Sequence, residues 1–589
     1  MSRKHLLSES ALERMGTLLA AVHEAEESAE DWRGSARIHV LRNYTTEPLD
    51  PYLKFHLLRD DIRPTISHGG YGTIAQELLD DESSIATTPP DVIVLSLLIE
   101  FLDPTVNDDG WSADTAIREM TSLFNILLDR TSAFVIANTF LPPIDLLFAD
   151  LSGSTTRELD RLNEHLLELA GRHTERVVVC EWRKLPGLGA LESAIDRRFW
   201  RSSEAPFRAT FLDLYARRIA SCVRAIKGLA KKCLVLDCDN TLWSGVIGED
   251  GMDGIGLDDK TEPGASFHRF QREIIKLHEK GVMLAICSKN NEDDVWDVFD
   301  SHRHSVLKKD HLVAWRINWD DKATNIASIV AELNIGMDSI VFVDDSPRER
   351  ALIAGRLPDV TLIAVPDDLS QYPHTLIRDG FFETLSTSVE DRNRTRMYQQ
   401  QNARSDEQQH FSDLTDYLRS LHTVIQISRA DERCISRVAQ LTQKTNQFNL
   451  TTRRYTEEQI RSFASDSQMA VFRMAVTDRF GDMGITGVFI ARLDGATAII
   501  DSVLLSCRVL GRQLEIAFVD QCMHALEDCW PIARWRAEYI ATPKNEQTAD
   551  FWDRIGFQVL QSDDSSSQYA TDVDSRIVDY LQIMTVESE

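Results

Sequence analysis

Short, nearly continuous apolar runs recur along this chain, and such runs predict strands that are buried on both faces. Three of them lie in the middle of the sequence, at residues 233–236, 282–288 and 339–344. Between the last two, apolar residues at helical spacing predict an amphipathic helix over residues 322–333. Strands that alternate with helices indicate a parallel sheet, so we expect an α/β domain over residues 223–380.

The N-terminal part of the chain shows the same alternation. After an amphipathic helix within residues 1–30, the pattern predicts a second parallel sheet in a domain of residues 31–222. Its expected strands are apolar runs of similar length, at residues 37–41, 91–98, 133–140 and 176–180.

The C-terminal third has a different order of elements. A polar, glutamine-rich stretch of residues 381–420 is typical of a helical linker. After it, a strand and a helix precede a hairpin of residues 469–477 and 485–493, a strand of residues 497–505 and another amphipathic helix. This order predicts an α+β domain over residues 421–589, so the whole chain is expected to be a multidomain α/β protein.

Polar residues follow the first central strand directly. Asp237 and Asp239 stand one residue apart at its carboxyl end, with Thr241 behind them. Ligands of open α/β sheets bind at that end of the strands. Two carboxylates this close need a compensating cation, and Mg²⁺ held by carboxylates and phosphate oxygens supplies one. A strand-to-turn junction with a helix cap is the alternative explanation.

The other central strands end in residues of the same kind. Ser288 closes the second strand and is followed by Lys289 and Asn290, where a hydroxyl can donate to a phosphate oxygen or cap the next helix. Lys322 opens the amphipathic helix, either as a phosphate ligand or as a solvated lysine.

The third strand ends in Asp344 and Asp345. Strand-Asp-x-Asp, strand-Ser, helix-Lys and strand-Asp-Asp, in this order within one α/β unit, form a specific combination.

This motif order resembles the haloacid dehalogenase (HAD) superfamily of phosphohydrolases and phosphotransferases, with a Rossmann-like fold. The resemblance implies that Asp237 attacks a phosphoryl group and that Asp239 protonates the leaving oxygen and then activates water. It implies phosphoryl contacts from Thr241, Ser288, Lys289, Asn290 and Lys322. It implies a Mg²⁺ site made by Asp237, Asp239 (through its carbonyl), Asp344 and Asp345. Only about 25 residues separate Thr241 from the next helix, which indicates a minimal cap and an open site.

Three stretches make the resemblance closer. Leu-Trp-Ser-Gly-Val-Ile-Gly-Glu-Asp-Gly at 242–251, Cys-Ser-Lys-Asn-Asn at 287–291 and Thr-Asn-Gln-Phe-Asn-Leu-Thr-Thr-Arg-Arg-Tyr at 445–455 resemble the FkbH-like family. This implies dephosphorylation of 1,3-bisphosphoglycerate and transfer of the glyceryl group to the phosphopantetheine thiol of an acyl carrier protein in polyketide biosynthesis. The alternatives are a plain HAD phosphatase and a GNAT-type acyltransferase with a regulatory HAD domain.

A thiol near the phosphoryl site could take the acyl group from such an acyl phosphate. We expect Cys287 to be that thiol, because Lys289 and a helix N-terminus should lower its pKa. A small buried hydrophobic residue is the alternative for Cys287. Cys238 comes second and Cys507 third.

The outer domains are similar to two further families. Residues 31–222 resemble an SGNH hydrolase, but the stretch Asn43–Thr46 after the first strand contains no serine. Thr45 or Thr46 could replace a serine or cap a helix, and we expect this domain to be non-catalytic. The C-terminal domain resembles a GNAT acyltransferase, although its turn keeps one glycine, Gly511, where backbone amides would approach coenzyme A phosphates. We therefore expect it to bind a pantetheine arm or a partner.

Composition narrows the function classes further. The chain has 589 residues, 43% of them apolar, and a formal net charge of −29, which argues against binding to nucleic-acid phosphates. A docking patch for an acidic carrier must then be locally basic, as in the stretch Arg197–Arg201. Nine cysteines without dense spacing indicate reduced thiols, and no apolar run approaches the ~18 residues that cross a membrane. We expect a cytoplasmic protein without membrane contact.

Overall fold

The computed structural model divides into two compact units, Met1–Lys231 with Ser370–Ser386, and Lys232–Leu369 with Thr387–Glu589. The structure describes residues 7, 9–28, 32–108, 110–144, 153–174, 176–185, 191–384, 395–397, 399–400, 404, 407, 410–411, 413–542, 544–563, 565–573 and 584–588. No helix in these ranges is both long and apolar enough to cross a bilayer.

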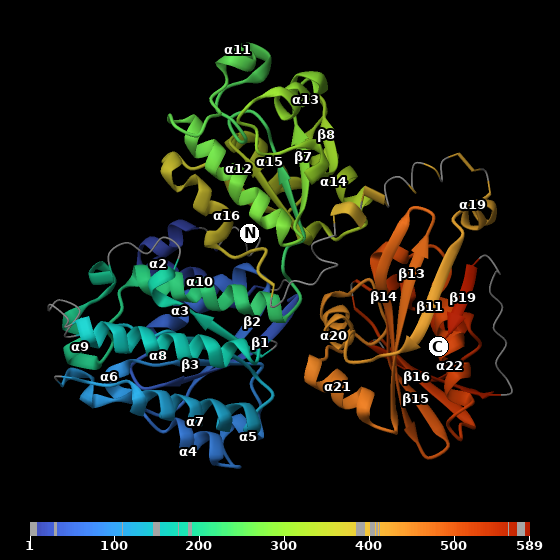
Figure 1. The fold of residues 1–589 in the computed structure, drawn as a ribbon, viewed down its shortest axis with the longest axis horizontal. Coiled ribbons are helices and arrows are strands. Elements are labelled where there is room, and N and C mark those ends of the chain that lie inside the picture. Colours follow the sequence, from blue (N-terminus) through green and yellow to red (C-terminus); the bar gives the residue numbers. More distant parts are fainter. Residues whose placement is uncertain are drawn as a thin grey trace. The chain divides into compact units, whose positions relative to one another are not determined.

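The first unit is built on a five-stranded parallel sheet in the order β2-β1-β3-β4-β5 (Figure 1). Its strands are β1 (Gly34–Arg42), β2 (Ile62–His68), β3 (Val92–Ser96), β4 (Phe134–Asn138) and β5 (Val177–Cys180). Its helices are α2 (Met15–Glu26), α3 (Asp50–Arg59), α4 (Ile74–Leu79), α5 (Ser84–Thr87), α6 (Ile99–Leu102), α7 (Asp114–Arg130), α8 (Gly153–Gly171), α9 (Arg197–Ser203), α10 (Ala209–Ile226) and α16 (Thr375–Arg378).

Both faces of this sheet are covered, as the continuous apolar strands predict. Helices α2, α3 and α10 bury one face, where Val40 and Val94 lie in the core. Helices α4, α7 and α8 bury the other, around Leu41 and Leu95. Adjacent strand residues therefore enter opposite cores, as expected from the two-residue period of a strand.

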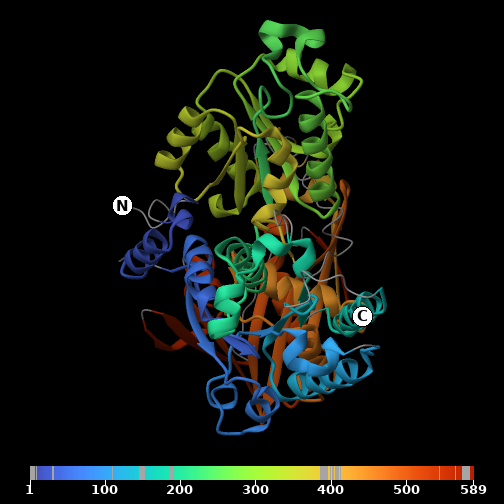
Figure 2. The ribbon, with the colours of Figure 1, turned by 90° about the vertical axis from the view of Figure 1, so that its left-hand side faces the viewer.

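The central domain holds a second parallel sheet, in the order β10-β9-β6-β7-β8. Figure 2 shows its strands between helices, in green and yellow-green. The strands are β6 (Cys233–Leu236), β7 (Met283–Ser288), β8 (Leu312–Ile317), β9 (Ile340–Asp344) and β10 (Thr361–Ala364). The helices are α11 (Ile247–Gly254), α12 (Gly264–Glu279), α13 (Glu292–Ser301), α14 (Lys322–Leu333) and α15 (Pro347–Arg356).

The order of this sheet determines where a site can form. Strand β6 is central, with β9 on one side and β7 on the other, so the carboxyl ends of these three strands meet at one edge. The chain leaves β6 and returns through only one short helix, α11, before α12 begins at Gly264. An insertion of this size leaves the strand ends without a separate cap domain.

The C-terminal domain contains a nine-stranded, mostly antiparallel sheet in the order β17-β18-β16-β15-β14-β13-β11-β19, with β12 paired to β15. The strands are β11 (Thr423–Arg429), β12 (Phe448–Asn449), β13 (Met469–Asp478), β14 (Gly481–Asp494), β15 (Thr497–Leu505), β16 (Arg534–Ile540), β17 (Gln558–Ser562), β18 (Ser566–Asp572) and β19 (Met584–Ser588). The helices are α19 (Leu414–Ser420), α20 (Ile435–Lys444), α21 (Glu457–Ser465), α22 (Leu514–Glu527) and α23 (Phe551–Arg554).

The predicted multidomain α/β fold class is confirmed. Strands β6 and β15 have the predicted bounds residue for residue. In the two parallel sheets the edge strands β2, β8 and β10 were missed, because their exposed or half-buried positions interrupt the apolar run. In the C-terminal domain β16 was missed, and only one strand was expected where β17, β18 and β19 lie. The predicted linker of residues 381–420 falls partly outside the described residues, and α19 forms its end.

Candidate active site

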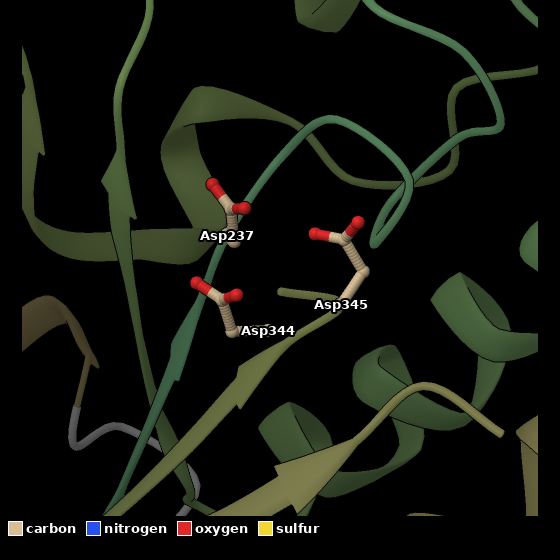
Figure 3. Close-up of side chains that lie close together, drawn as sticks. All are labelled: Asp237, Asp344 and Asp345. Atoms are coloured by element: carbon tan, nitrogen blue, oxygen red, sulfur yellow. The ribbon is translucent and has the colours of Figure 1, made fainter. Parts of the chain in front are cut away.

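Three carboxylates gather at the ends of two neighbouring strands. Asp237 follows β6, and Asp344 and Asp345 close β9 (Figure 3). One oxygen from each lies within 4.8 Å of the others. The sequence placed all three at strand ends, and the pairing of β6 with β9 brings them together.

A lysine lies among these acids. Lys322, the first residue of α14, places Nζ 2.9 Å from Asp237 Oδ2 and 2.6 Å from Asp344 Oδ2. Its side chain is 4% exposed, so it is not a solvated lysine. Burial by itself lowers the pKa of Lys322, but Asp237 and Asp344 outweigh burial and raise it, so the amine stays charged.

The lysine does not balance the whole cluster. Burial, together with Asp237 and Asp344, raises the pKa of Asp345 to about 6. Burial and then Asp237 also raise the pKa of Asp344. Three acids facing one cation leave an excess of negative charge and a set of hard oxygen donors. These residues fit Mg²⁺, which prefers carboxylate oxygen and compensates the charge.

Ser288 and Asn290 connect the end of β7 to the aspartates. Ser288 Oγ donates to Asp237 Oδ1 at 2.7 Å, and Asn290 Nδ2 donates to Asp239 Oδ2 at 3.0 Å and to Ser288 Oγ at 3.2 Å. Both side chains are buried and lie beside the atoms at which a phosphoryl group would arrive. The structure therefore brings these two predicted residues into the site.

Asp239 lies beside the three-carboxylate group and is held by several donors. Its Oδ1 accepts from the Trp243 indole at 2.9 Å and from the Ile247 amide at 3.1 Å. Its other oxygen, Oδ2, accepts the bond from Asn290. Trp243 was missed as a site residue, although it lies in the stretch 242–251 that carries the resemblance and stands four residues after Asp239. Within the described part of the chain, the carboxylate of Asp239 is not one of the clustered metal-binding groups.

The predicted phosphoryl contact of Lys289 is not supported, and that of Thr241 stays a prediction. Lys289 Nζ donates to Glu349 Oε1 of α15 at 2.9 Å, so its charge is paired with a different acid. Thr241 is fully buried, in the turn where its amide donates to the carbonyl of Cys238.

The predicted activation of Cys287 is wrong. Cys287 and Ser288 are adjacent on β7 and face opposite sides of the sheet, so the thiol of Cys287 enters the core with Ile326 and Ile329 of α14. Burial raises the pKa of Cys287 to about 12, where the sequence predicted a lowered pKa. Burial, with Asp237 next to it, also raises the pKa of Cys238. Neither thiol is a ready nucleophile.

The family-like stretch of residues 446–454 has a structural role in the C-terminal domain. Strands β15 and β16 pair only over Thr497–Ile499 and then separate. Strand β12 pairs with β15, the amide of Leu450 donates to the carbonyl of Val503, and the amide of Ile540 donates to the carbonyl of Leu450. The stretch thus fills the gap between the two strands.

The turn before α22 departs from an open phosphate-binding loop. Gly511 and Gln513 both have positive φ, 77° and 60°. The Arg512 side chain turns inward, and its Nη1 donates to Asp478 Oδ2 at 2.9 Å. Asp478 also accepts two bonds of 2.7 Å from Arg404, so Arg512 belongs to a buried ion-pair network.

No protein-family model and no curated protein matches the chain. A crystal structure of the N-terminal part of BF1531 from Bacteroides fragilis, which contains a phosphatase domain and is complexed with Mg, is similar to it. The identity is 25% and the TM-score 0.54, over 66% of this chain and 100% of that chain.

Two acetyltransferase structures cover about a quarter of the chain. They are the ribosomal-protein-S18-alanine N-acetyltransferase from Escherichia coli (14% identity, TM-score 0.21, 25% of this chain and 94% of that chain) and the GNAT domain of S. lividans PAT (12%, 0.21, 25% and 89%).

The similarity to BF1531, together with the aspartates at the ends of β6 and β9, defines the class of the central domain. It is a HAD-type phosphatase domain, and the chain is therefore an enzyme.

Proposed function

We propose that this chain is a Mg²⁺-dependent phosphatase or phosphotransferase in which Asp237 is the nucleophile. One observation carries this proposal: the carboxylate of Asp237 lies at the end of the central strand, in contact with both Ser288 and Lys322. A carboxylate with a hydroxyl and an ammonium beside it can attack phosphorus while those two groups hold the phosphoryl oxygens.

The two aspartates after β6 divide the chemistry. Asp237 forms a bond to phosphorus, and the bond from phosphorus to the leaving oxygen breaks. Asp239 gives that oxygen a proton and later takes one from the water that hydrolyses the aspartyl phosphate. Its bonds from Trp243, Ile247 and Asn290 fix its orientation for both steps.

Asp237, Asp344 and Asp345 would hold Mg²⁺ in this site, together with the carbonyl of Asp239. When bound, Mg²⁺ polarises the phosphoryl oxygens and neutralises their developing charge. Lys322 then balances the carboxylates from the other side, through its contacts with Asp237 and Asp344.

We further propose that the substrate is 1,3-bisphosphoglycerate and that the glyceryl group passes through an enzyme thioester to an acyl carrier protein of polyketide biosynthesis. The support is the FkbH-like sequence of residues 242–251, 287–291 and 445–455. A thiolate would attack the acyl carbonyl, the carbon–oxygen bond would break, and phosphate would leave. Of the three candidate thiols, Cys238 and Cys287 are buried and Cys507 is half-buried, so Cys507 is the most accessible of the three to a carrier arm.

The locally basic stretch supports an acidic carrier as the partner. In α9 the side chains of Arg197, Arg198, Phe199 and Arg201 are exposed, in a chain of net charge −29. Such a patch reduces the repulsion between two acidic proteins and steers their association.

The GNAT-type acyltransferase alternative has less support. Residues 446–454 occupy the gap between β15 and β16. The side chain of Arg512 forms an ion pair with Asp478. A coenzyme laid along either strand would have to displace these bonds. A role for this domain as a partner platform needs no such displacement.

The test uses the full chain with Mg²⁺, 1,3-bisphosphoglycerate and an acyl carrier protein, and follows phosphate release together with the intact mass of the carrier. Asp237→Asn should abolish the phosphate release that passes through the aspartyl phosphate, because an amide cannot become an acyl phosphate, and should leave only the phosphate that the thiolate expels from the acyl phosphate. Asp320→Asn, an exposed acid of the same domain, is the matched control. Phosphate release without a gain in carrier mass would leave a plain phosphatase, and release by Asp237→Asn at the wild-type rate would refute the nucleophile.

A further inference from the structure

A serine, a histidine and a glutamate form a chain of contacts in the first unit, remote in sequence from the phosphatase motifs. His39 of β1 and Ser67 of β2 are register partners in neighbouring parallel strands. Ser67 Oγ lies 2.8 Å from His39 Nδ1. On the other side of the ring, His39 Nε2 lies 2.8 Å from Oε1 of Glu77, which comes from α4.

The two contacts assign the roles of the imidazole nitrogens. The carboxylate of Glu77 favours a proton on Nε2, although this close contact lacks the angle of a hydrogen bond. This tautomer leaves the lone pair of Nδ1 facing the hydroxyl of Ser67. His39 is 3% exposed, and burial lowers its pKa although Glu77 opposes the shift. The ring is therefore a neutral base at neutral pH, hydrogen-bonded to a hydroxyl and oriented by an acid.

A second hydroxyl, histidine and carboxylate in the same unit make similar contacts, but their hydroxyl is not accessible to a substrate. Thr46 Oγ1 lies 2.9 Å from His68 Nδ1, and His68 Nε2 lies 2.9 Å from Asp50 Oδ1. Thr46 makes no side-chain cap at the helix that follows it, so its predicted capping role is wrong. Thr46 is only 2% exposed, whereas Ser67 is exposed on the edge strand. A substrate carbonyl can reach Ser67 from solvent, but it cannot reach Thr46.

Gly69 leaves room for the acid. A Cβ at residue 69 would lie 2.4 Å from Glu77 Oε2, closer than unbonded atoms approach. Any side chain there would push the carboxylate of Glu77, the movable end of a flexible side chain, away from His39. Glycine, which has no side chain, therefore stands directly after β2, where the carboxylate of Glu77 lies.

We propose that Ser67, His39 and Glu77 form a second catalytic site, which transfers or hydrolyses the acyl group of a carboxylic ester or thioester. Ser67 Oγ forms a bond to the carbonyl carbon while its proton passes to His39 Nδ1. The bond to the leaving alkoxide or thiolate breaks, and His39 returns the proton to that group. Water then attacks the acyl-serine by the same route and releases the acid. This activity goes beyond the proposed phosphatase and replaces the expectation that the domain of residues 31–222 is non-catalytic. It needs neither Mg²⁺ nor any residue of the central domain.

A fluorophosphonate probe tests the site without knowledge of the natural substrate. Attack by Ser67 forms an oxygen–phosphorus bond and expels fluoride, and peptide mass mapping locates the label. We expect the label on Ser67, none on Ser67→Ala, and a labelling rate lower by about 10²-fold or more for His39→Gln, which lacks the base. Hydrolysis of p-nitrophenyl acetate should fall in the same order.

Three further variants separate catalysis from folding. Thr65→Ala removes an exposed hydroxyl on the same face of β2 and should leave labelling unchanged. Thr46→Val should also leave it unchanged, because that hydroxyl belongs to the buried set. Gly69→Ala should slow labelling while Ser67 and His39 stay intact, with circular dichroism to show that each variant folds. A full-length wild type that takes no label, or that carries it on another residue, would overturn the proposal, as would equal labelling rates in wild type and His39→Gln.

Discussion

Replacing Lys322 by methionine tests the charge balance of the phosphatase site directly. Methionine keeps the approximate length of the side chain but removes the ammonium that lies 2.9 Å from Asp237 Oδ2 and 2.6 Å from Asp344 Oδ2. At an effective dielectric constant of about 20, each contact is worth about 6 kcal/mol of Coulomb energy, most of which offsets the desolvation of the groups. Removing one partner of such a buried network costs about 3–5 kcal/mol, because the remaining charges stay buried.

Hydrogen exchange measured by mass spectrometry reports this loss of stability peptide by peptide. A local measurement is needed because a chain with several domains does not unfold in a single step. Peptides that cover β6 and β9 report the opening of the two strands that carry the acids. A cost of about 3–5 kcal/mol corresponds to exchange faster by roughly 10²- to 10⁴-fold in the presence of a chelator. Adding Mg²⁺ should slow the exchange again, because a divalent cation binds only the folded site and supplies the missing positive charge.

A second lysine of the same domain is the matched control. Lys289 forms an ion pair with Glu349, but its side chain is 35% exposed, so Lys289→Met should cost less than about 1 kcal/mol. If Lys322→Met exchanged no faster than Lys289→Met in chelator, the lysine would not balance the acids. If Mg²⁺ left the exchange of Lys322→Met unchanged, the acids would not form a cation site.

Three other outcomes follow from the same geometry. Asp345→Ala should weaken Mg²⁺ binding at least tenfold by isothermal titration calorimetry and abolish the phosphate release that passes through Asp237, and full activity in chelator would show that the acids are only structural. Iodoacetamide at neutral pH should modify the exposed Cys529 in the folded chain and spare Cys287, whose pKa burial raises to about 12; equal modification would contradict the burial of Cys287. Burial by itself raises the pKa of Asp379, but Arg59 and Arg217 hold it well below its usual range, so this acid stabilises the first unit above pH ~4 and the benefit is lost as pH falls further. Asp379→Asn should lower the thermal midpoint of that unit at pH 7 and flatten its decline in acid, and an unchanged acid profile would exclude this role.

Much of the phosphatase site could be predicted because the signal is local. Strands β6, β7 and β9 are buried on both faces, so their sequences are apolar throughout and end in the polar residues that face a ligand. The order of Asp237, Ser288, Lys322 and Asp345 then predicted a HAD-type phosphatase domain before any distance was known. Edge strands give no such signal: β2 alternates between buried and exposed residues and contains a proline, and it was missed.

The sequence by itself determined the alternation of strands and helices, the three regions of the chain and the acids at the strand ends, because apolar periodicity and strand termination depend on neighbouring residues only. The tertiary structure decided which face each side chain occupies. On β7 the two-residue period sends Ser288 to the site and Cys287 to the core, a difference that composition cannot show. The register of β1 with β2 likewise places His39 opposite Ser67, and α4 then brings Glu77 to the ring. Contacts between distant residues depend on register and packing, and both are set only when the sheet forms.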